Sequence, residues 1–271
     1  MVIQAPDFLQ NLLRHLSLLL LVTAASIASV AQESSPAPIL PPGKISPPPA
    51  NYHFPDRRIY TFSAEWHTLV AGTGVIHMET AGRERKIVAS ADTLGAVNML
   101  FPVRDRFEAR FDPQTFCSQS ITKHSEEGSH KRETAIHFNY ATSKSLLDET
   151  NLKTNEKKHV ESDLPACASD ILTGFYYLQS RPLQVGDAYE FPVSDGKTAI
   201  VRATVEKREH IKVPAGSFST VLVVAETISG SLQSKGKLWI WYSDDLEHTP
   251  VQIRAKLGFG NLVFRMQKIE N

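Results

Sequence analysis

The sequence predicts a mainly β domain, in which a curved antiparallel sheet closes toward a barrel or half-barrel and one short helix packs on it. Most of the chain after residue 58 consists of short segments of alternating hydropathy, separated by Gly, Pro, Asn and Asp. Strands do not alternate with long helical segments, so a parallel sheet is not expected. About ten to twelve short strands joined by tight turns are typical of barrels, half-barrels and sandwiches.

Period-two alternation is clearest in two segments. In residues 59–70, Tyr60, Phe62, Ala64 and Trp66 fall on one face, and the glycines of residues 71–74 predict a turn. In residues 104–111, Phe107, Ala109 and Phe111 share a face. Further strands are expected over residues 75–80, 86–91, 116–125, 132–140, 189–193, 199–205, 221–225, 238–242, 251–256 and 262–268, with short ones near 146 and 160.

One helix is expected over residues 171–180. Ser169 or Asp170 can cap its first turn, apolar residues recur along one side, and Arg181-Pro182 ends it. Residues 94–100 have only a weak helical pattern.

The N-terminal residues have the layout of a secretory signal. Arg14 precedes an uncharged apolar stretch over residues 16–30, which ends in small residues up to Ala31. We therefore predict a cleavable Sec-type signal peptide over residues 1–31 and a periplasmic or secreted protein. The apolar stretch is short for a membrane span, and we expect no transmembrane segment after cleavage.

Proline dominates the next segment. Residues 32–57 hold eight of the sixteen prolines and predict a disordered linker that favours polyproline II. Residues 58–271 then form a single β domain.

The composition bears on two questions: whether the protein binds nucleic acid, and whether its cysteines are bonded. Lys plus Arg equals Asp plus Glu, so no net charge favours binding to nucleic acid. Outside the cytoplasm the only two cysteines, Cys117 and Cys167, are expected to form a disulfide, and two free thiols are the alternative.

No group of residues points to catalysis, a metal or a cofactor. The histidines form neither HExxH nor HxH, although His67 and His77 could face each other across a hairpin. There is no GxSxG sequence and no phosphate-binding glycine loop. We therefore expect no enzyme, and a hydrolase is the least favoured reading.

The segment Leu238–Tyr242 is apolar on both strand faces, with Trp239 and Trp241 on one of them. Either the strand is buried between the core and a helix, or one face lines an apolar cavity. Trp66 is open to the same two interpretations. If a cavity exists, we expect Trp66, Tyr176, Trp239 and Trp241 to line it.

Several segments resemble the DUF3108 family, which consists of exported bacterial proteins of unknown function. The similar segments, in order, are Tyr60–Trp66, Phe175–Leu183 with Gly186-Asp187, Val213–Phe218 and Leu238–Asp245. The resemblance implies a β-rich domain of the cell envelope and transfers no catalytic residue. A further similarity, to the half-barrels of lipoprotein carriers, is an analogy of fold only.

Two functions follow as hypotheses. The protein would bind an apolar ligand, such as a lipid or a lipoprotein, or an envelope partner, on a concave aromatic face. The alternative is a structural or assembly protein of the envelope with a filled core.

Overall fold

The structure, a computed structural model, describes residues 43–66, 69–229, 236–257 and 260–271. The predicted signal peptide, residues 32–42 of the predicted linker and His67 lie outside these residues.

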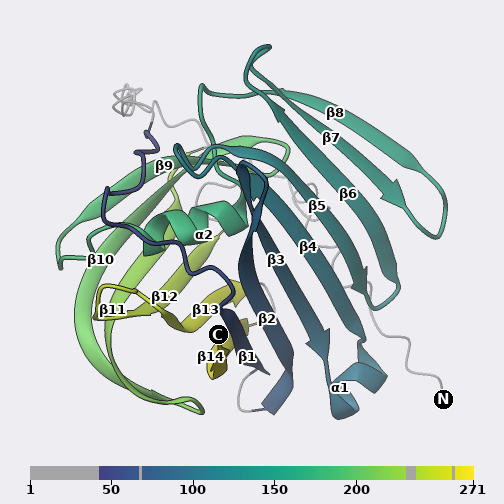
Figure 1. Cartoon of the computed structure of the whole chain (residues 1–271). Coiled ribbons are helices and arrows are strands. Elements are labelled where there is room, and N and C mark those ends of the chain that lie inside the picture. The colour runs from purple at the N-terminus through teal and green to yellow at the C-terminus, as the bar shows by residue number, and fades with distance from the viewer. Residues whose placement is uncertain (1–42, 67–68, 230–235, 258–259) are drawn as a thin grey trace, which may run out of the picture. The chain divides into compact units, whose positions relative to one another are not determined.

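The described residues form one antiparallel sheet of fourteen strands (Figure 1). The strands are β1 (Ile59–Trp66), β2 (Leu69–Ala81), β3 (Glu84–Thr93), β4 (Val103–Phe111), β5 (Ser118–Glu127), β6 (His130–Asn139), β7 (Lys144–Asn151), β8 (Lys157–Asp163), β9 (Ala188–Ser194), β10 (Thr198–Val213), β11 (Gly216–Thr227), β12 (Lys237–Ser243), β13 (Pro250–Leu257) and β14 (Gly260–Glu270). Their order in the sheet is β8-β7-β6-β5-β4-β3-β2-β1-β14-β13-β12-β11-β10-β9. The predicted fold class is confirmed, and the sheet is not closed, because β8 and β9 are its two edges.

Every neighbouring pair along the chain forms a hairpin except β8 and β9, between which the helix α2 (Ile171–Gln179) is inserted. In the middle of the sheet the first strand β1 pairs with the last strand β14, which joins the two runs of hairpins into one sheet. Residues 71–74, predicted as a turn, lie inside β2. A Cβ on Gly72 would lie only 2.2 Å from the carbonyl oxygen of Asp92. The glycine therefore allows the backbones of β2 and β3 to lie close together at this point.

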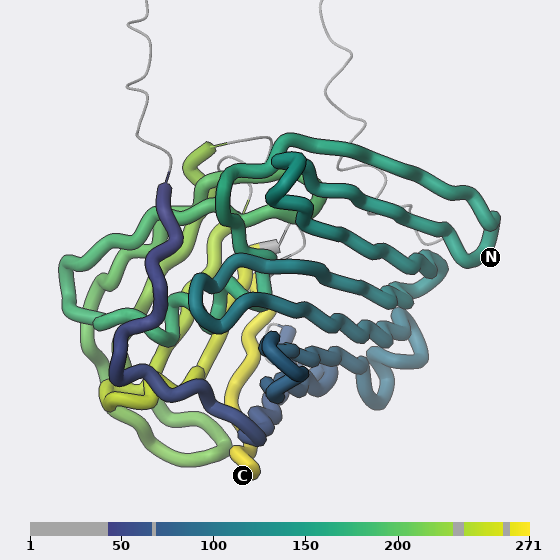
Figure 2. Tube along the Cα trace, turned by 45° about the horizontal axis from the view of Figure 1, so that its top comes forward, coloured from purple at the N-terminus to yellow at the C-terminus, as the bar shows by residue number. Residues whose placement is uncertain are grey.

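The sheet bends around α2, which packs against its inner face (Figures 1 and 2). Asp170 caps the helix: its Oδ1 accepts hydrogen bonds from the backbone N–H groups of Leu172 (2.8 Å) and Thr173 (3.0 Å). Its Oδ2 accepts from the hydroxyl groups of Ser118 and Thr173, both at 2.6 Å. A second helix, α1 (Gly95–Leu100), joins β3 to β4 and buries none of its residues.

The predicted disulfide is confirmed. Cys117 and Cys167 are bonded, with 5.1 Å between their Cα atoms. The bridge ties the residue before β5 to the segment that leads into α2, so it holds the first turn of the helix near β5.

The described part of the predicted linker packs on the domain. The side chain of Ile45 is buried, and Arg181 donates a hydrogen bond to the carbonyl oxygen of Pro47 (2.8 Å). The rings of Tyr52 and Phe54 contact Phe116. Residues 43–57 therefore form a strap that crosses α2 (Figure 1), which differs from the disordered linker predicted up to residue 57. The reason is that the three large apolar side chains of this segment, Ile45, Tyr52 and Phe54, pack against the hydrophobic core of the domain.

Candidate ligand pocket

A pocket of about 350 Å³ lies between α2 and the inner face of the sheet. Its lining comes from eleven of the elements: β1 to β4, α2 and β9 to β14. The lining residues are Phe62, Gly74, Val75, Ile76, Ala89, Ser90, Ala91, Asp105, Phe107, Ile171, Leu172, Gly174, Phe175, Leu178, Phe191, Val193, Val201, Ala225, Leu238, Ile240, Ile253 and Phe264. Asp105 is the only ionisable side chain among them, so the pocket suits an apolar molecule.

Small residues on the sheet create the space. Gly74 of β2 pairs with Ala91 of β3, and Ala89 lies two residues from Ala91 on the same strand. A Cβ on Gly74 would come within 3.2 Å of the Phe264 ring. Larger side chains at these positions would fill the gap between sheet and helix, so the cavity depends on their small size.

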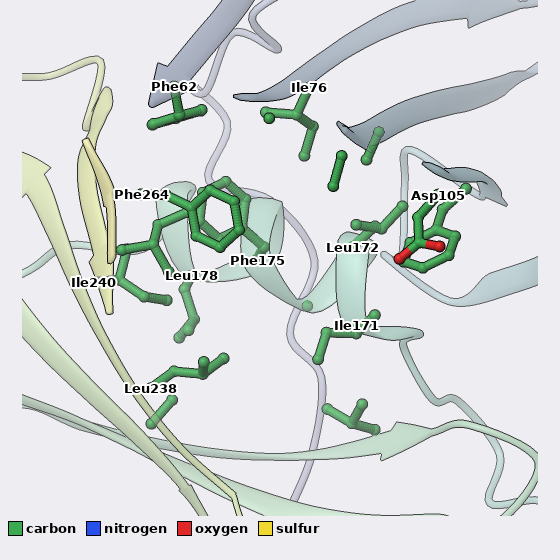
Figure 3. Close-up of a pocket in the computed structure, with 18 of the residues that line it drawn as sticks. Phe62, Ile76, Asp105, Ile171, Leu172, Phe175, Leu178, Leu238, Ile240 and Phe264 are labelled. Carbon is green, nitrogen blue, oxygen red and sulfur yellow. The ribbon is translucent and has the colours of Figure 1, made fainter. Parts of the chain in front are cut away.

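The helix supplies the opposite wall. Figure 3 shows Ile171, Leu172, Phe175 and Leu178 of α2 facing Phe62, Ile76, Leu238, Ile240 and Phe264 from the sheet. The Ile171 side chain is 51% exposed, which places the opening of the pocket at the first turn of α2. Water can therefore be displaced from apolar side chains there when a ligand enters.

Asp105 lies in the wall beside Leu172 (Figure 3), and Phe107 of the same strand also lines the pocket. Its carboxyl group accepts one hydrogen bond within the described residues, from the backbone N–H of Glu126 to Oδ1 (3.2 Å). Burial raises the pKa of this carboxyl group to about 6, and the negative charge of Glu127 adds to the shift. The group is thus an isolated carboxyl in an otherwise apolar wall.

The structure separates the two faces of β12. Leu238 and Ile240 line the pocket, and the hydroxyl group of Tyr242 donates to the carbonyl oxygen of Phe175 in α2 (2.9 Å). Trp239 and Trp241, which we expected in the cavity, lie on the outer face, where Trp241 packs with Leu222 and Val224.

Polar groups cover these two indoles. The Trp241 Nε1–H donates to Glu209 Oε1 (2.8 Å), and the Arg254 guanidinium lies 4.1 Å from the Trp239 ring centroid. A cation over the ring face stabilises an aromatic side chain that the sheet does not bury. This explains how both faces of β12 can be apolar although only one meets the pocket.

The two other predicted lining residues also lie elsewhere. Tyr176 is fully buried in the core, where its ring packs edge-to-face against Phe175. Trp66 ends β1 and is 37% exposed. None of the four predicted residues is among those that line this pocket.

The sequence carried a signal for the residues that do line it. The alternation of Phe107, Ala109 and Phe111 continues backward to Asp105, which places a carboxylate on an apolar face. An isolated charge on such a face needs a partner or a function. The small residues of β2 and β3 gave no comparable signal, because Ala and Gly in a strand do not distinguish a sheet that lines a cavity from one that packs closely against its neighbour.

Two kinds of site are not found within the described residues. No group of three or more His, Cys, Asp or Glu side chains is placed to hold a metal ion. Neither α1, with six residues, nor α2, with nine, has the length and apolar character that a membrane-spanning helix needs.

The family model of DUF3108, described as a protein of unknown function, matches residues 61–267. The chain belongs to the DUF3108 family. The match includes all fourteen strands in whole or in part, together with α2 and every residue of the pocket. Comparison with curated proteins gives no match.

Three solved structures align with the chain at low sequence identity, and one of them has a TM-score above 0.5. A β-barrel-like DUF1849 protein from Brucella abortus has a TM-score of 0.52 at 6% identity, over 79% of this chain and 96% of that one. A predicted exported protein with a YmcC-like fold from Bacteroides fragilis has a TM-score of 0.31 at 9% identity, over 84% and 100%. A predicted lipoprotein from Parabacteroides distasonis has a TM-score of 0.29 at 10% identity, over 85% and 100%. The first of these supports a barrel-like fold for the DUF3108 chain.

Proposed function

We propose that this DUF3108 protein is a non-enzymatic binding protein that holds one apolar chain, such as the chain of a lipid, between α2 and the inner face of the sheet. The observation that carries the proposal is the pocket of about 350 Å³ with a lining that is apolar except for Asp105 and Ser90. Known ligand pockets of about 300–1,000 Å³ have this kind of lining. A water molecule occupies about 30 Å³, so there is room for roughly a dozen groups of similar size, as in a medium-length alkyl chain.

The proposal includes the location. The signal-like layout of residues 1–31 supports export to the periplasm or beyond. The disulfide between Cys117 and Cys167 fits an oxidising compartment.

Extraction of the purified protein with organic solvent, followed by mass spectrometry, tests the binding proposal. We expect a lipid-like molecule in the extract of the wild type and much less of it from the variant Ala89→Leu/Ala91→Leu, in which the pocket is filled. Titration with N-phenyl-1-naphthylamine, a neutral apolar fluorophore, gives a second readout. Equal dye binding by both proteins would contradict the proposal.

A second candidate function, docking of an envelope protein, is favoured by one exposed apolar surface. This surface, the α1 rim, consists of Leu69, Val70, Leu94, Met99, Leu100 and Phe101. Met99 and Leu100 are 86% and 85% exposed, and α1 is held to β2 by a hydrogen bond from Leu94 N–H to the Ala71 carbonyl oxygen (2.9 Å). A contiguous exposed apolar patch is typical of an interaction site.

A photo-crosslinking amino acid at position 99 tests this second candidate in intact cells. The control carries the same group at Leu246, which is 94% exposed between β12 and β13 and distant in the chain from the α1 rim. We expect a discrete cross-linked product at position 99 that Leu100→Ser weakens. The same product at position 246, or no product at position 99, would contradict docking at the α1 rim.

A further inference from the structure

The one ionisable group of the pocket carries an inference about the ligand. Asp105 lies on β4 with Ala91 of β3 on one side and Ser125 of β5 on the other. The helix side of the pocket adds only apolar residues near it, Ile171 and Leu172. Asp105 as a whole residue is 9% exposed and counts among the buried charged residues, so its carboxyl group has lost contact with bulk water.

The carboxyl group has unused capacity for hydrogen bonds. Among the described residues it accepts one hydrogen bond, from Glu126 N–H, and the cations Arg106 and His124 act on it without a direct ion pair. A carboxylate can accept several hydrogen bonds through its two oxygen atoms, so Oδ2 remains without a donor. In Figure 3 the carboxyl oxygens of Asp105 lie near Leu172 of α2, at one end of the pocket.

Two cations, Arg106 and His124, act on the Asp105 carboxyl group and oppose the rise of its pKa, but each is also held by other partners. On β4, Arg106 forms an ion pair with Asp92 of β3. On β5, His124 contacts Glu126 and Glu133, Glu126 also contacts Lys131, and Glu127 acts on Asp105 as a negative charge. Burial and the charge of Glu127 outweigh these two cations, so the carboxyl group retains capacity for a further positively charged partner.

We propose that Asp105 binds the polar end of the ligand, and that the ligand is an amphiphile in which an alkyl or acyl chain ends in a protonated amine. The chain would lie between Phe175 and the small residues Ala89 and Ala91, and the amine would donate to Asp105. This inference rests on the proposed function and names the class of molecule that the same pocket takes.

The carboxyl group also makes the affinity for an amine depend on pH. Burial and Glu127 raise the pKa of Asp105 to about 6, so its negative charge is present above that pH and absent well below it. An alkyl amine stays protonated throughout this range, because its pKa is close to that of a lysine side chain at about 10.4. The affinity for an amine should therefore rise between pH 5 and pH 8, while that for a neutral alcohol stays constant.

Three probes with one chain length test the inference. Dodecylamine, 1-dodecanol and dodecanoate, each below the concentration at which it forms micelles, compete with N-phenyl-1-naphthylamine for the purified protein. The expected order of affinity at pH 8 is amine, alcohol, carboxylate. Asp105→Asn should weaken dodecylamine by about tenfold or more, because a hydrogen bond to a charged group is lost, and should change dodecanol by less than about threefold. Asp148→Asn, which changes an exposed carboxylate of β7, is the matched control and should leave all three unchanged.

The outcomes separate the two proposals. If Asp105→Asn binds dodecylamine as tightly as the wild type, the inference about Asp105 is wrong while apolar binding stands. A preference for dodecanoate over the amine at pH 8 overturns the amine class. If none of the three probes displaces the dye from the wild type, or if the dye itself does not bind, the proposed function is overturned as well.

Discussion

The two sides of α2 meet the same sheet in different ways. On one side, Tyr177 packs against Phe116 with ring centroids 5.7 Å apart, and Phe116 stacks on Phe111 at 5.4 Å. On the other side, Leu172 and Phe175 face Ala89 and Ala91 across open space. The helix is thus fixed by a solid aromatic core on one side, and this leaves the other side free to remain unfilled.

The difference explains how a cavity can persist in a domain of this size. An unfilled space costs dispersion contacts along its walls, and that loss must be offset by packing elsewhere. Here the Asp170 cap, the disulfide and the strap of residues 43–57 all hold α2 at its place over the sheet. Mutations on the two sides should therefore have different effects on stability and on binding.

The largest expected effect is loss of the aromatic core. Phe116→Ala removes a fully buried ring that touches Phe111 and Tyr177, and it should lower the free energy of unfolding by about 3–5 kcal/mol. Leu172→Ala on the pocket side removes a partly buried side chain that borders open space and should cost about 1 kcal/mol. Urea denaturation followed by circular dichroism measures both, and equal losses would remove the contrast between the two sides.

Loss of the disulfide is expected to have the second-largest effect on the free energy of unfolding. Cys117→Ser/Cys167→Ser frees a loop of 50 residues and is expected to lower the free energy of unfolding by about 2–4 kcal/mol. The same value should be obtained by adding a reductant to the wild type. A variant as stable as the wild type would show that the strap and the helix cap hold α2 without the bridge.

The third effect depends on pH and isolates the pocket side. Since burial raises the folded-state pKa of Asp105 from 3.8 to about 6, the folded protein binds this proton more tightly than the unfolded chain does. The associated stability is complete below about pH 4 and is lost as pH rises through about 6, by on the order of 1–3 kcal/mol. Without ligand, Asp105→Asn should therefore be more stable than the wild type at pH 8 and equally stable near pH 4. Urea denaturation at both pH values measures the difference, and a constant difference would mean that the carboxyl group is not buried in solution.

The smallest expected change in stability comes from filling the cavity. Ala89→Leu and Ala91→Leu place larger side chains into open space, so the free energy of unfolding should change by less than about 1 kcal/mol. Dye binding should nevertheless be lost. The control Ala96→Leu on α1, an exposed residue outside the pocket, should retain it. A large loss of stability in the cavity variants would show that this side is packed as tightly as the other.

The sequence predicted most of the strands, the helix α2 and the disulfide, but few of the residues that line the pocket. Alternation identified the strands, Asp170 and the apolar spacing identified α2, and two cysteines in a chain with a signal-like N-terminus predicted the bridge that the structure contains. Each of these signals is local or depends on a pair of unique residues. The pocket instead arises where β2 and β3 pass opposite β12 and β13, which local patterns do not specify.

The residues of β12 illustrate the limit most clearly. Alternation separated Trp239 and Trp241 from Leu238 and Ile240, but it could not tell which set faced inward. Size favoured the tryptophans for the cavity, whereas Glu209 and Arg254 stabilise them on the outer face. The partners that decide this belong to β10 and β13, and only the strand order brings them to β12.

The most direct test of the account is a crystal structure of the protein with 12-bromododecan-1-ol, in which anomalous scattering locates the bromine. The account predicts one bromine peak inside the pocket, between α2 and the small residues of β2 and β3, with density for the chain leading to the opening near Ile171. A peak on the α1 rim with an empty pocket, or an inner face closed onto α2 without space, would contradict the claim that this protein holds an apolar chain beneath its helix.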